Sequence, residues 1–136
     1  MDAALRDLVW ARASSQCEYC HLPQSAAPVA RFQIEHIRAK QHGGQTIDEN
    51  LALACPRCNA YKGPNLTAVD SETDQIVSVF HPRSQNWDDH FRLGGSEILG
   101  LTPTGRATVR LLHMNDDNRI EARAGLLARG EFGASS

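Results

Sequence analysis

The chain of 136 residues has no apolar run of about eighteen residues, so we expect no transmembrane helix. The first ten residues lack the apolar centre of a secretory signal, which favours a cytoplasmic protein. Aromatic residues make up only 6% and hydrophobic residues 41% of the chain. At the length of one ordinary domain, these fractions predict a modest core that a bound metal would help to stabilise.

The chain also lacks an excess of positive charge, because its formal net charge is -2. This value excludes a globally basic nucleic-acid-binding protein, so a nucleic-acid partner must meet a local basic patch. The chain shows no internal repeat, low-complexity run or clear linker. We therefore expect one domain over residues 1–136.

Cysteine is rare as well, but its placement is informative. The only four cysteines form two CxxC pairs, Cys17 with Cys20 and Cys55 with Cys58. Without an export signal they are expected to be reduced and to bind one structural zinc through four thiolates. A [4Fe–4S] cluster is a weaker alternative because ferredoxin spacing differs. A redox CxxC protein is a third reading, although the expected βαβ context is missing.

Periodicity and turn residues predict a mixture of short helices and strands. Around the cysteines, the expected elements are a helix at 3–15, a loop at 23–28, a strand at 29–37, a reversal at 41–45, a strand at 51–54 and a helical turn at 59–62. Beyond them, we expect a strand at 75–80, a hairpin at 87–101, helices at 103–113 and 116–128, and a loose tail at 130–136.

Polar motifs lie between and just after the cysteine pairs. In order they are Glu35-His36, Gly43-Gly44, Asn50-Leu51-Ala52-Leu53 and Cys55-Pro56-Arg57-Cys58-Asn59-Ala60-Tyr61-Lys62-Gly63. Over about residues 17–64 this pattern resembles the HNH endonuclease family. The segments Phe80-His81-Pro82-Arg83 and Trp87-Asp88-Asp89-His90-Phe91 are similar to the C-terminal extension of stand-alone bacterial members.

The resemblance implies an α+β fold with a ββα-metal, treble-clef-like core and a structural zinc. An N-terminal helix would precede this core, and a hairpin and helix extension at about 74–129 would follow it. The resemblance also implies that His36 is the general base, since imidazole titrates near neutral pH. A core histidine at a strand end is the alternative reading.

The same resemblance places Glu35 and Asn59 at a catalytic metal, with Glu35 on the strand face opposite His36. Many members of the family have a histidine where this chain has Asn59. Oxygen ligands from both residues suit Mg²⁺ or Mn²⁺ better than Ni²⁺ or Zn²⁺. A surface carboxylate is the alternative for Glu35. Asn50 is expected to hold the loop after His36 through its amide, or else to cap a turn.

A local basic set lies near these motifs, and we expect it to contact phosphates without reading sequence. Its members are Arg38, Lys40, Arg57 and Lys62. Solvated surface charge is the alternative for each of them. Arg83 and His90 are weaker candidates for accessory phosphate contacts, because a packed cluster of Trp87, His90 and Phe91 explains that segment more simply.

These residues together predict a metal-dependent endonuclease that cuts DNA, with RNA as a further substrate to consider. The resemblance implies 5′-phosphate and 3′-hydroxyl products. One metal site per chain cuts one strand, so a double-strand break requires a homodimer or two independent nicks. The absence of an evident recognition domain favours low sequence specificity or a targeting partner. The alternative function is a non-catalytic zinc module that binds nucleic acid or protein.

Overall fold

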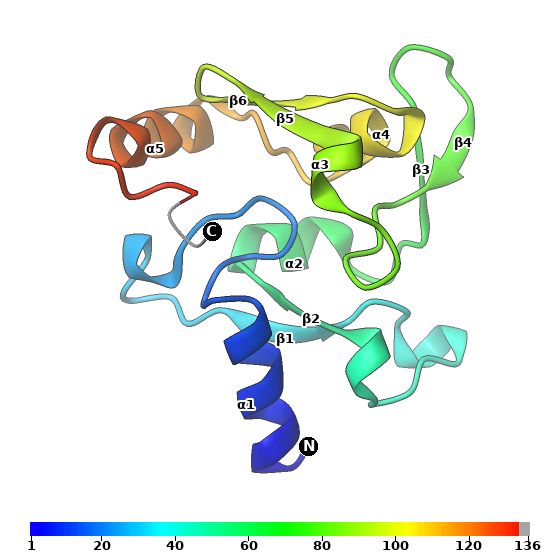
Figure 1. Cartoon of the computed structure of the whole chain (residues 1–136). Helices are drawn as coiled ribbons and strands as arrows, with labels where there is room; N and C mark the ends of the chain where they lie inside the picture. Colours follow the sequence, from blue (N-terminus) through cyan, green and yellow to red (C-terminus); the bar gives the residue numbers. More distant parts are fainter. Residues whose placement is uncertain (134–136) are drawn as a thin grey trace.

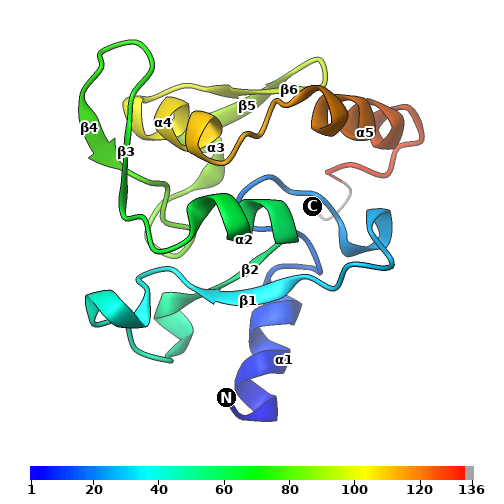
Figure 2. The same cartoon turned by 180° about the vertical axis from the view of Figure 1, so that it is seen from behind.

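A computed structural model describes residues 1–133, and its elements stack in layers (Figures 1 and 2). Helix α1 (Ala3–Arg12) lies beneath a hairpin formed by β1 (Gln33–His36) and β2 (Leu51–Ala54). Helix α2 (Pro56–Lys62) lies on the other side of this hairpin, and the chain after α2 forms a further layer above it. The hairpin is therefore covered on both faces.

Burial on both faces explains the composition of the second strand. All four residues of β2, Leu-Ala-Leu-Ala, are buried, as expected for a strand enclosed from both sides. The strands pair antiparallel, with Glu35 opposite Ala52 and His36 opposite Leu51. The strand expected at 29–37 begins only at Gln33, because Val29 is fully exposed and the segment before Gln33 has no strand partner.

Helix α2 begins at Pro56, earlier than the helical turn expected at 59–62. The sulfur of Cys55 caps the helix by accepting a hydrogen bond from the Cys58 amide at 3.4 Å, and Pro56 occupies the first turn. The helix ends at Gly63, which has a φ of +48°. Glycine takes this conformation at low cost, so the helix ends where the helical turn at 59–62 was expected to end.

The remaining residues form the extension, which packs above α2 (Figure 2). Its elements are β3 (Thr67–Val69), β4 (Ile76–Ser78), α3 (Trp87–His90), β5 (Phe91–Gly94), β6 (Glu97–Gly100), α4 (Pro103–Leu111) and α5 (Asp117–Ala128). Short 3-10 turns lie in the first half of the chain, at Gln24–Ala26, Lys40–His42 and Asp48–Asn50.

The extension differs from the expected elements at two places. Residues 87–90 form a helical turn and not the start of a strand, because Asn86 leads into two aspartates that favour a first helical turn. Strand β3 was not expected, and it exists because it pairs with β4. The hairpin of β5 and β6 and the two helices are confirmed. Thr102 caps α4 by accepting a hydrogen bond from the Gly105 amide at 3.0 Å.

One hydrophobic core joins the layers. It includes Val9 of α1, Leu51 of β2, Phe80 after β4, Phe91 of β5 and Leu112 after α4. None of the helices in residues 1–133 is both long and apolar enough to cross a membrane. Of the tail expected at 130–136, residues 134–136 lie outside the described residues.

Candidate metal centres

The four cysteines converge on one buried point. Their sulfur atoms all lie within 4.8 Å of one another, and the sulfurs of Cys20 and Cys55 are 3.8 Å apart. A regular tetrahedron with zinc–sulfur bonds of about 2.3 Å has edges of about 3.8 Å. The four-thiolate set therefore fits a structural zinc.

Local backbone structure brings the two pairs together. The Cys17 amide donates to the Leu22 carbonyl and the His21 amide donates to the Cys17 carbonyl, both at 2.9 Å, which closes a tight turn around the first pair. The second pair lies at the start of α2, where Cys55 is the cap. A turn after α1 and a helix start after β2 thus face each other.

Arg119 of α5 reaches this cluster from the extension, and no sequence motif marks it. Arg119 donates from Nη2 to the sulfur of Cys58 at 3.2 Å and approaches the sulfur of Cys55 at 3.8 Å. Burial by itself would lower the pKa of Arg119, but the charge of Cys58 and Cys20 outweighs burial and raises it. Arg123, one turn later, instead donates to the carbonyls of Ser96 and Met114. Arg119 and Arg123 are four residues apart, so in the sequence they already indicated two arginines on one face of a helix.

A second cluster lies at the far end of the hairpin, around a cavity of about 430 Å³. The cavity is lined by Glu35, His36, Ala39, Lys40, Asn59, Ala60 and Gly63. Strand β1 supplies Glu35 and His36, and α2 supplies Asn59. The structure thus brings together the three polar residues that the sequence singled out for chemistry.

Glu35 is the most enclosed of the three, with 7% of its surface exposed. Its Oε1 accepts a hydrogen bond from the Tyr19 hydroxyl, and its Oε2 lies 3.5 Å from the ammonium of Lys62. Burial raises the pKa of Glu35, while Lys62 and Tyr19 partly offset this effect. The carboxylate is therefore held by specific partners at the wall of the cavity.

Lys62 differs from its expected role. Only 1% of its surface is exposed, and its Nζ donates to the Ile37 carbonyl at 2.8 Å. The side chain lies at the end of α2, facing the hairpin, where its charge neutralises Glu35. In the structure an interior ion pair thus takes the place of the surface phosphate contact expected for Lys62.

His36 is half-buried at the end of β1. Its Nε2 lies 2.9 Å from Thr46 Oγ1, a residue that no sequence motif marks. Burial lowers the pKa of His36, and the nearby charge of Lys40 lowers it further. A lowered pKa favours the neutral imidazole, which is the form that a general base requires.

Asn59 is oriented by a neighbour on β1. Its Nδ2 donates to Gln33 Oε1, which leaves its own Oδ1 available as a ligand atom. Gln33 precedes Glu35 by two residues, so strand alternation places both on the same side. That spacing was the signal for Gln33 in the sequence.

Asn50 makes the backbone contacts expected of it. Its Oδ1 accepts from the Arg38 amide at 2.8 Å, and its Nδ2 donates to the carbonyls of Arg38 at 3.0 Å and Gln45 at 2.9 Å. Gly44 makes this approach possible, since a Cβ atom there would lie 1.7 Å from the Arg38 carbonyl oxygen. The loop after His36 is therefore closed by one amide.

The other basic residues lie on different surfaces. Lys40 lines the cavity with His36, whereas exposed Arg38 lines a neighbouring groove of about 780 Å³. Arg57 is exposed and donates to Asn118 Oδ1 of α5 at 3.0 Å. Lys40 is thus the basic residue that shares a cavity with the candidate base.

The accessory phosphate contacts considered for Arg83 and His90 are not supported. Arg83 pairs with Glu18, and burial lowers the pKa of Arg83 to about 10. Nδ1 of His90 lies 2.6 Å from Thr102 Oγ1. The ring centroids of Trp87 and Phe91 are 5.0 Å apart, so these residues form the packed cluster that was the simpler explanation.

Comparison with known proteins now adds to this geometry. The family model described as HNH endonuclease matches residues 17–65. This segment contains all four cysteines, the β1–β2 hairpin and α2, so it is an HNH-type domain with a four-cysteine site that fits zinc. HNH domains are associated with nuclease function. No curated protein and no solved structure matches the chain.

Proposed function

We propose that this chain is a divalent-metal-dependent endonuclease that hydrolyses phosphodiester bonds in DNA. Its catalytic unit would be a ββα-metal core made of β1, β2 and α2, with one structural zinc. The observation that carries the proposal is the convergence of Glu35, His36 and Asn59 on one cavity. A zinc module that only binds a partner would not require these three residues together.

His36 acts as the general base. With Nε2 as the N–H that donates to Thr46, the other ring nitrogen, Nδ1, has the lone pair needed to take a proton from water. The lowered pKa keeps this nitrogen unprotonated at neutral pH. The water so activated attacks the phosphorus atom of the scissile phosphodiester.

Glu35 and Asn59 would hold Mg²⁺ or Mn²⁺ through Glu35 Oε2 and Asn59 Oδ1. Two protein oxygens suit such an ion, because magnesium in proteins keeps several waters and often binds substrate phosphate as well. When bound, the ion supplies positive charge to the phosphate and to the departing 3′ oxygen. The amide of Asn50 keeps the loop after His36 in place during this step.

Phosphate binding would fall to the exposed basic residues. Lys40 stands beside His36 in the cavity, Arg38 lines a separate groove, and Arg57 is exposed near α5. These contacts position a backbone without reading bases. Since the described residues form one such cavity, we propose that each chain cuts one strand, and that double-strand cleavage needs a homodimer or two independent nicks.

Plasmid cleavage tests the proposal. Zinc-loaded wild type with Mg²⁺ or Mn²⁺ should nick supercoiled DNA, and His36→Ala should lower the rate by about 10²–10⁴-fold. His113→Ala is the matched control, because His113 is exposed and lies outside the cavity. A parallel assay on single-stranded RNA shows which nucleic acid is preferred.

One result would replace the proposal with the alternative. If folded, zinc-loaded wild type binds DNA but cleaves nothing with any of Mg²⁺, Mn²⁺, Ni²⁺ or Zn²⁺, the chain is a binding module. Equal cleavage by wild type and His36→Ala would instead remove His36 from the mechanism.

A further inference from the structure

The two residues between the first pair of cysteines reach into the hairpin. The amide of Glu18 donates to the Leu53 carbonyl at 2.9 Å, and its Oε2 accepts from the Leu53 amide at 2.8 Å. Glu18 therefore binds both backbone hydrogen-bonding groups of Leu53, which holds β2 at that residue. The turn that carries Cys17 and Cys20 is thereby fixed to the hairpin.

Tyr19, the next residue, reaches the other strand. It is fully buried, and its hydroxyl donates to Oε1 of Glu35 on β1. Glu35 pairs with Ala52, the residue directly before Leu53. The turn around the first cysteine pair thus contacts both strands at adjacent positions, and its contact on β1 is the carboxylate at the cavity wall.

The tyrosine ring has little freedom to move. Trp87 donates from Nε1 to the Tyr19 carbonyl at 2.7 Å, and the ring of Phe80 meets the Tyr19 ring edge-on at 6.5 Å. Along the chain, Tyr19 lies between Cys17 and Cys20, the two buried cysteines of the first pair. A hydroxyl held in this way is a fixed donor, which is the property required of a residue that orients a metal ligand.

We propose that Tyr19 is a positioning residue that links the two metal sites. Because it lies within the structural zinc site and binds Glu35, it fixes the position of this proposed ligand of the catalytic metal. The Tyr19 hydroxyl holds Oε1 of Glu35 while Lys62 approaches Oε2 at 3.5 Å, so the carboxylate proposed to bind a divalent cation is kept in one orientation. This inference rests on the proposed role of Glu35 as a ligand. The zinc site then does more than hold the fold together.

Direct measurement of Mn²⁺ binding tests the inference without turnover. Titration of zinc-loaded protein, followed by electron paramagnetic resonance of free Mn²⁺, should show about tenfold weaker binding by Tyr19→Phe. Zinc content and unfolding temperature are measured on the same samples. Tyr61→Phe is the control, because it removes a hydroxyl from an exposed ring of α2 that is outside the cavity lining.

A Glu35→Gln variant separates this inference from the proposed function. If Glu35→Gln binds Mn²⁺ as wild type does, Glu35 is no ligand and the proposed metal site fails. If Glu35→Gln loses Mn²⁺ binding while zinc-loaded Tyr19→Phe keeps wild-type affinity, the ligand assignment stands and the role of Tyr19 is overturned. Weakened binding in both variants, with zinc retained, supports both.

Wild-type protein supplies a second test in case Tyr19→Phe does not fold. Carbon-13 resonances of the Glu35 carboxyl and the Tyr19 ring carbon bonded to oxygen are followed during Mg²⁺ titration. Both should shift together, at the same Mg²⁺ concentration, because they share a hydrogen bond. A Glu35 shift with no change at Tyr19 would contradict the inference.

Discussion

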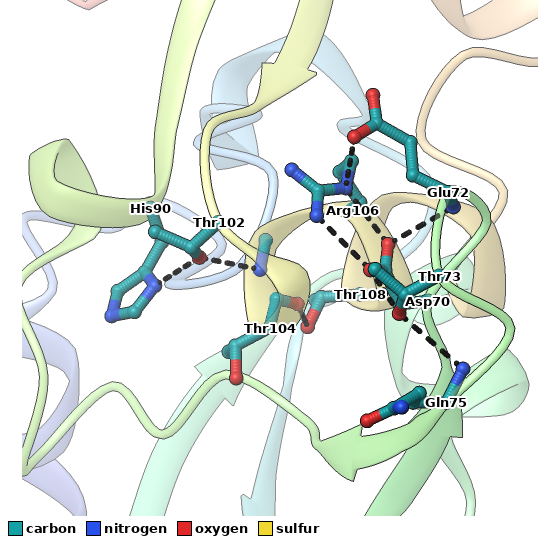
Figure 3. A network of polar contacts seen from close by, with 10 residues as sticks. Asp70, Glu72, Thr73, Gln75, His90, Thr102, Thr104, Arg106 and Thr108 are labelled. Atoms are coloured by element: carbon teal, nitrogen blue, oxygen red, sulfur yellow. Dashed lines mark hydrogen bonds and ion pairs between the residues drawn. The ribbon is translucent and has the colours of Figure 1, made fainter.

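Two polar clusters in this chain have opposite characters. In the extension, Asp70 is fully buried and both of its oxygens are occupied (Figure 3). They accept from Arg106 Nε at 2.8 Å and Nη2 at 3.0 Å, from Thr73 Oγ1 at 2.7 Å and from the Glu72 amide at 3.2 Å. This cluster ties the turn after β3 to α4.

The HNH segment shows the other arrangement. His36 is held at Nε2 by Thr46, and Asn59 is held at Nδ2 by Gln33. Their remaining polar atoms belong to side chains that line an open cavity. A cluster whose groups are all satisfied stabilises a fold, whereas one that is fixed at one end and free at the other can bind or react.

Removal of zinc should have the largest effect, because it acts on the HNH segment as a whole. A structural zinc contributes about 10–16 kcal/mol of apparent binding free energy in small zinc domains. A strong chelator should therefore abolish the cooperative thermal transition, followed by circular dichroism, and added Zn²⁺ should restore it. An unchanged transition after complete zinc removal would show that the layers hold without the metal.

Asp70→Asn tests the other cluster, the fully satisfied one in the extension. It removes the charge that Arg106 pairs with, so the unfolding temperature should fall while cleavage per folded molecule stays at the wild-type rate. Differential scanning calorimetry and plasmid nicking measure the two quantities. A loss of cleavage without a loss of stability would mean that the extension takes part in the reaction.

The same pair predicts a pH dependence. The hydrogen bonds from Arg106 hold the pKa of Asp70 well below its ordinary value. A carboxyl with a depressed pKa stabilises the fold above the pKa it has when unfolded, about 3.9, and this contribution is lost as pH falls towards the folded value. Urea denaturation below about pH 4 should therefore show a shallower pH dependence in Asp70→Asn than in wild type.

Arg119 joins the two regions, because it comes from the extension and donates to sulfurs of the HNH segment. Arg119→Met should speed zinc release to a chromogenic chelator about tenfold, since a donor to the thiolates is lost. Arg123→Met removes a comparable arginine whose hydrogen bonds go to the carbonyls of Ser96 and Met114, so it should destabilise the fold with less effect on release. If both variants released zinc at the same rate, Arg119 would contribute to packing and not specifically to zinc retention.

The spacing of residues in the sequence predicted those features that depend on residues close together in the chain. Two CxxC pairs, an acidic-His dipeptide and an asparagine before a Leu-x-Leu run were sufficient to anticipate the zinc site, the HNH match and the contacts of Asn50. Gly44 fits the same logic, because only a residue without a side chain lets Asn50 reach the Arg38 carbonyl.

Contacts that depend on how distant layers pack could not be read from the sequence. Lys62 follows the second cysteine pair like a surface residue, yet the hairpin covers it. Arg119 lies far along the chain from the thiols that it contacts, and strand β3 exists only because β4 pairs with it. Burial decided the cases of Lys62 and Arg119, since a charged group enclosed by other elements must find a partner there.

Thr46→Val should give the smallest effect and sharpen the comparison most. Valine keeps the shape of threonine but cannot accept from Nε2–H of His36, so the base loses the contact that selects its tautomer. One net hydrogen bond of about 1 kcal/mol corresponds to about a fivefold lower single-turnover cleavage rate. Thr46 is exposed, so the unfolding temperature should not change. Thr46→Ser, which restores the hydroxyl, should recover the rate. If Thr46→Val cleaves at the wild-type rate while Thr46→Ser, which lacks the methyl group, is slow, the methyl group of Thr46 and not its oxygen positions the ring, and the fixed end of the reactive cluster is apolar.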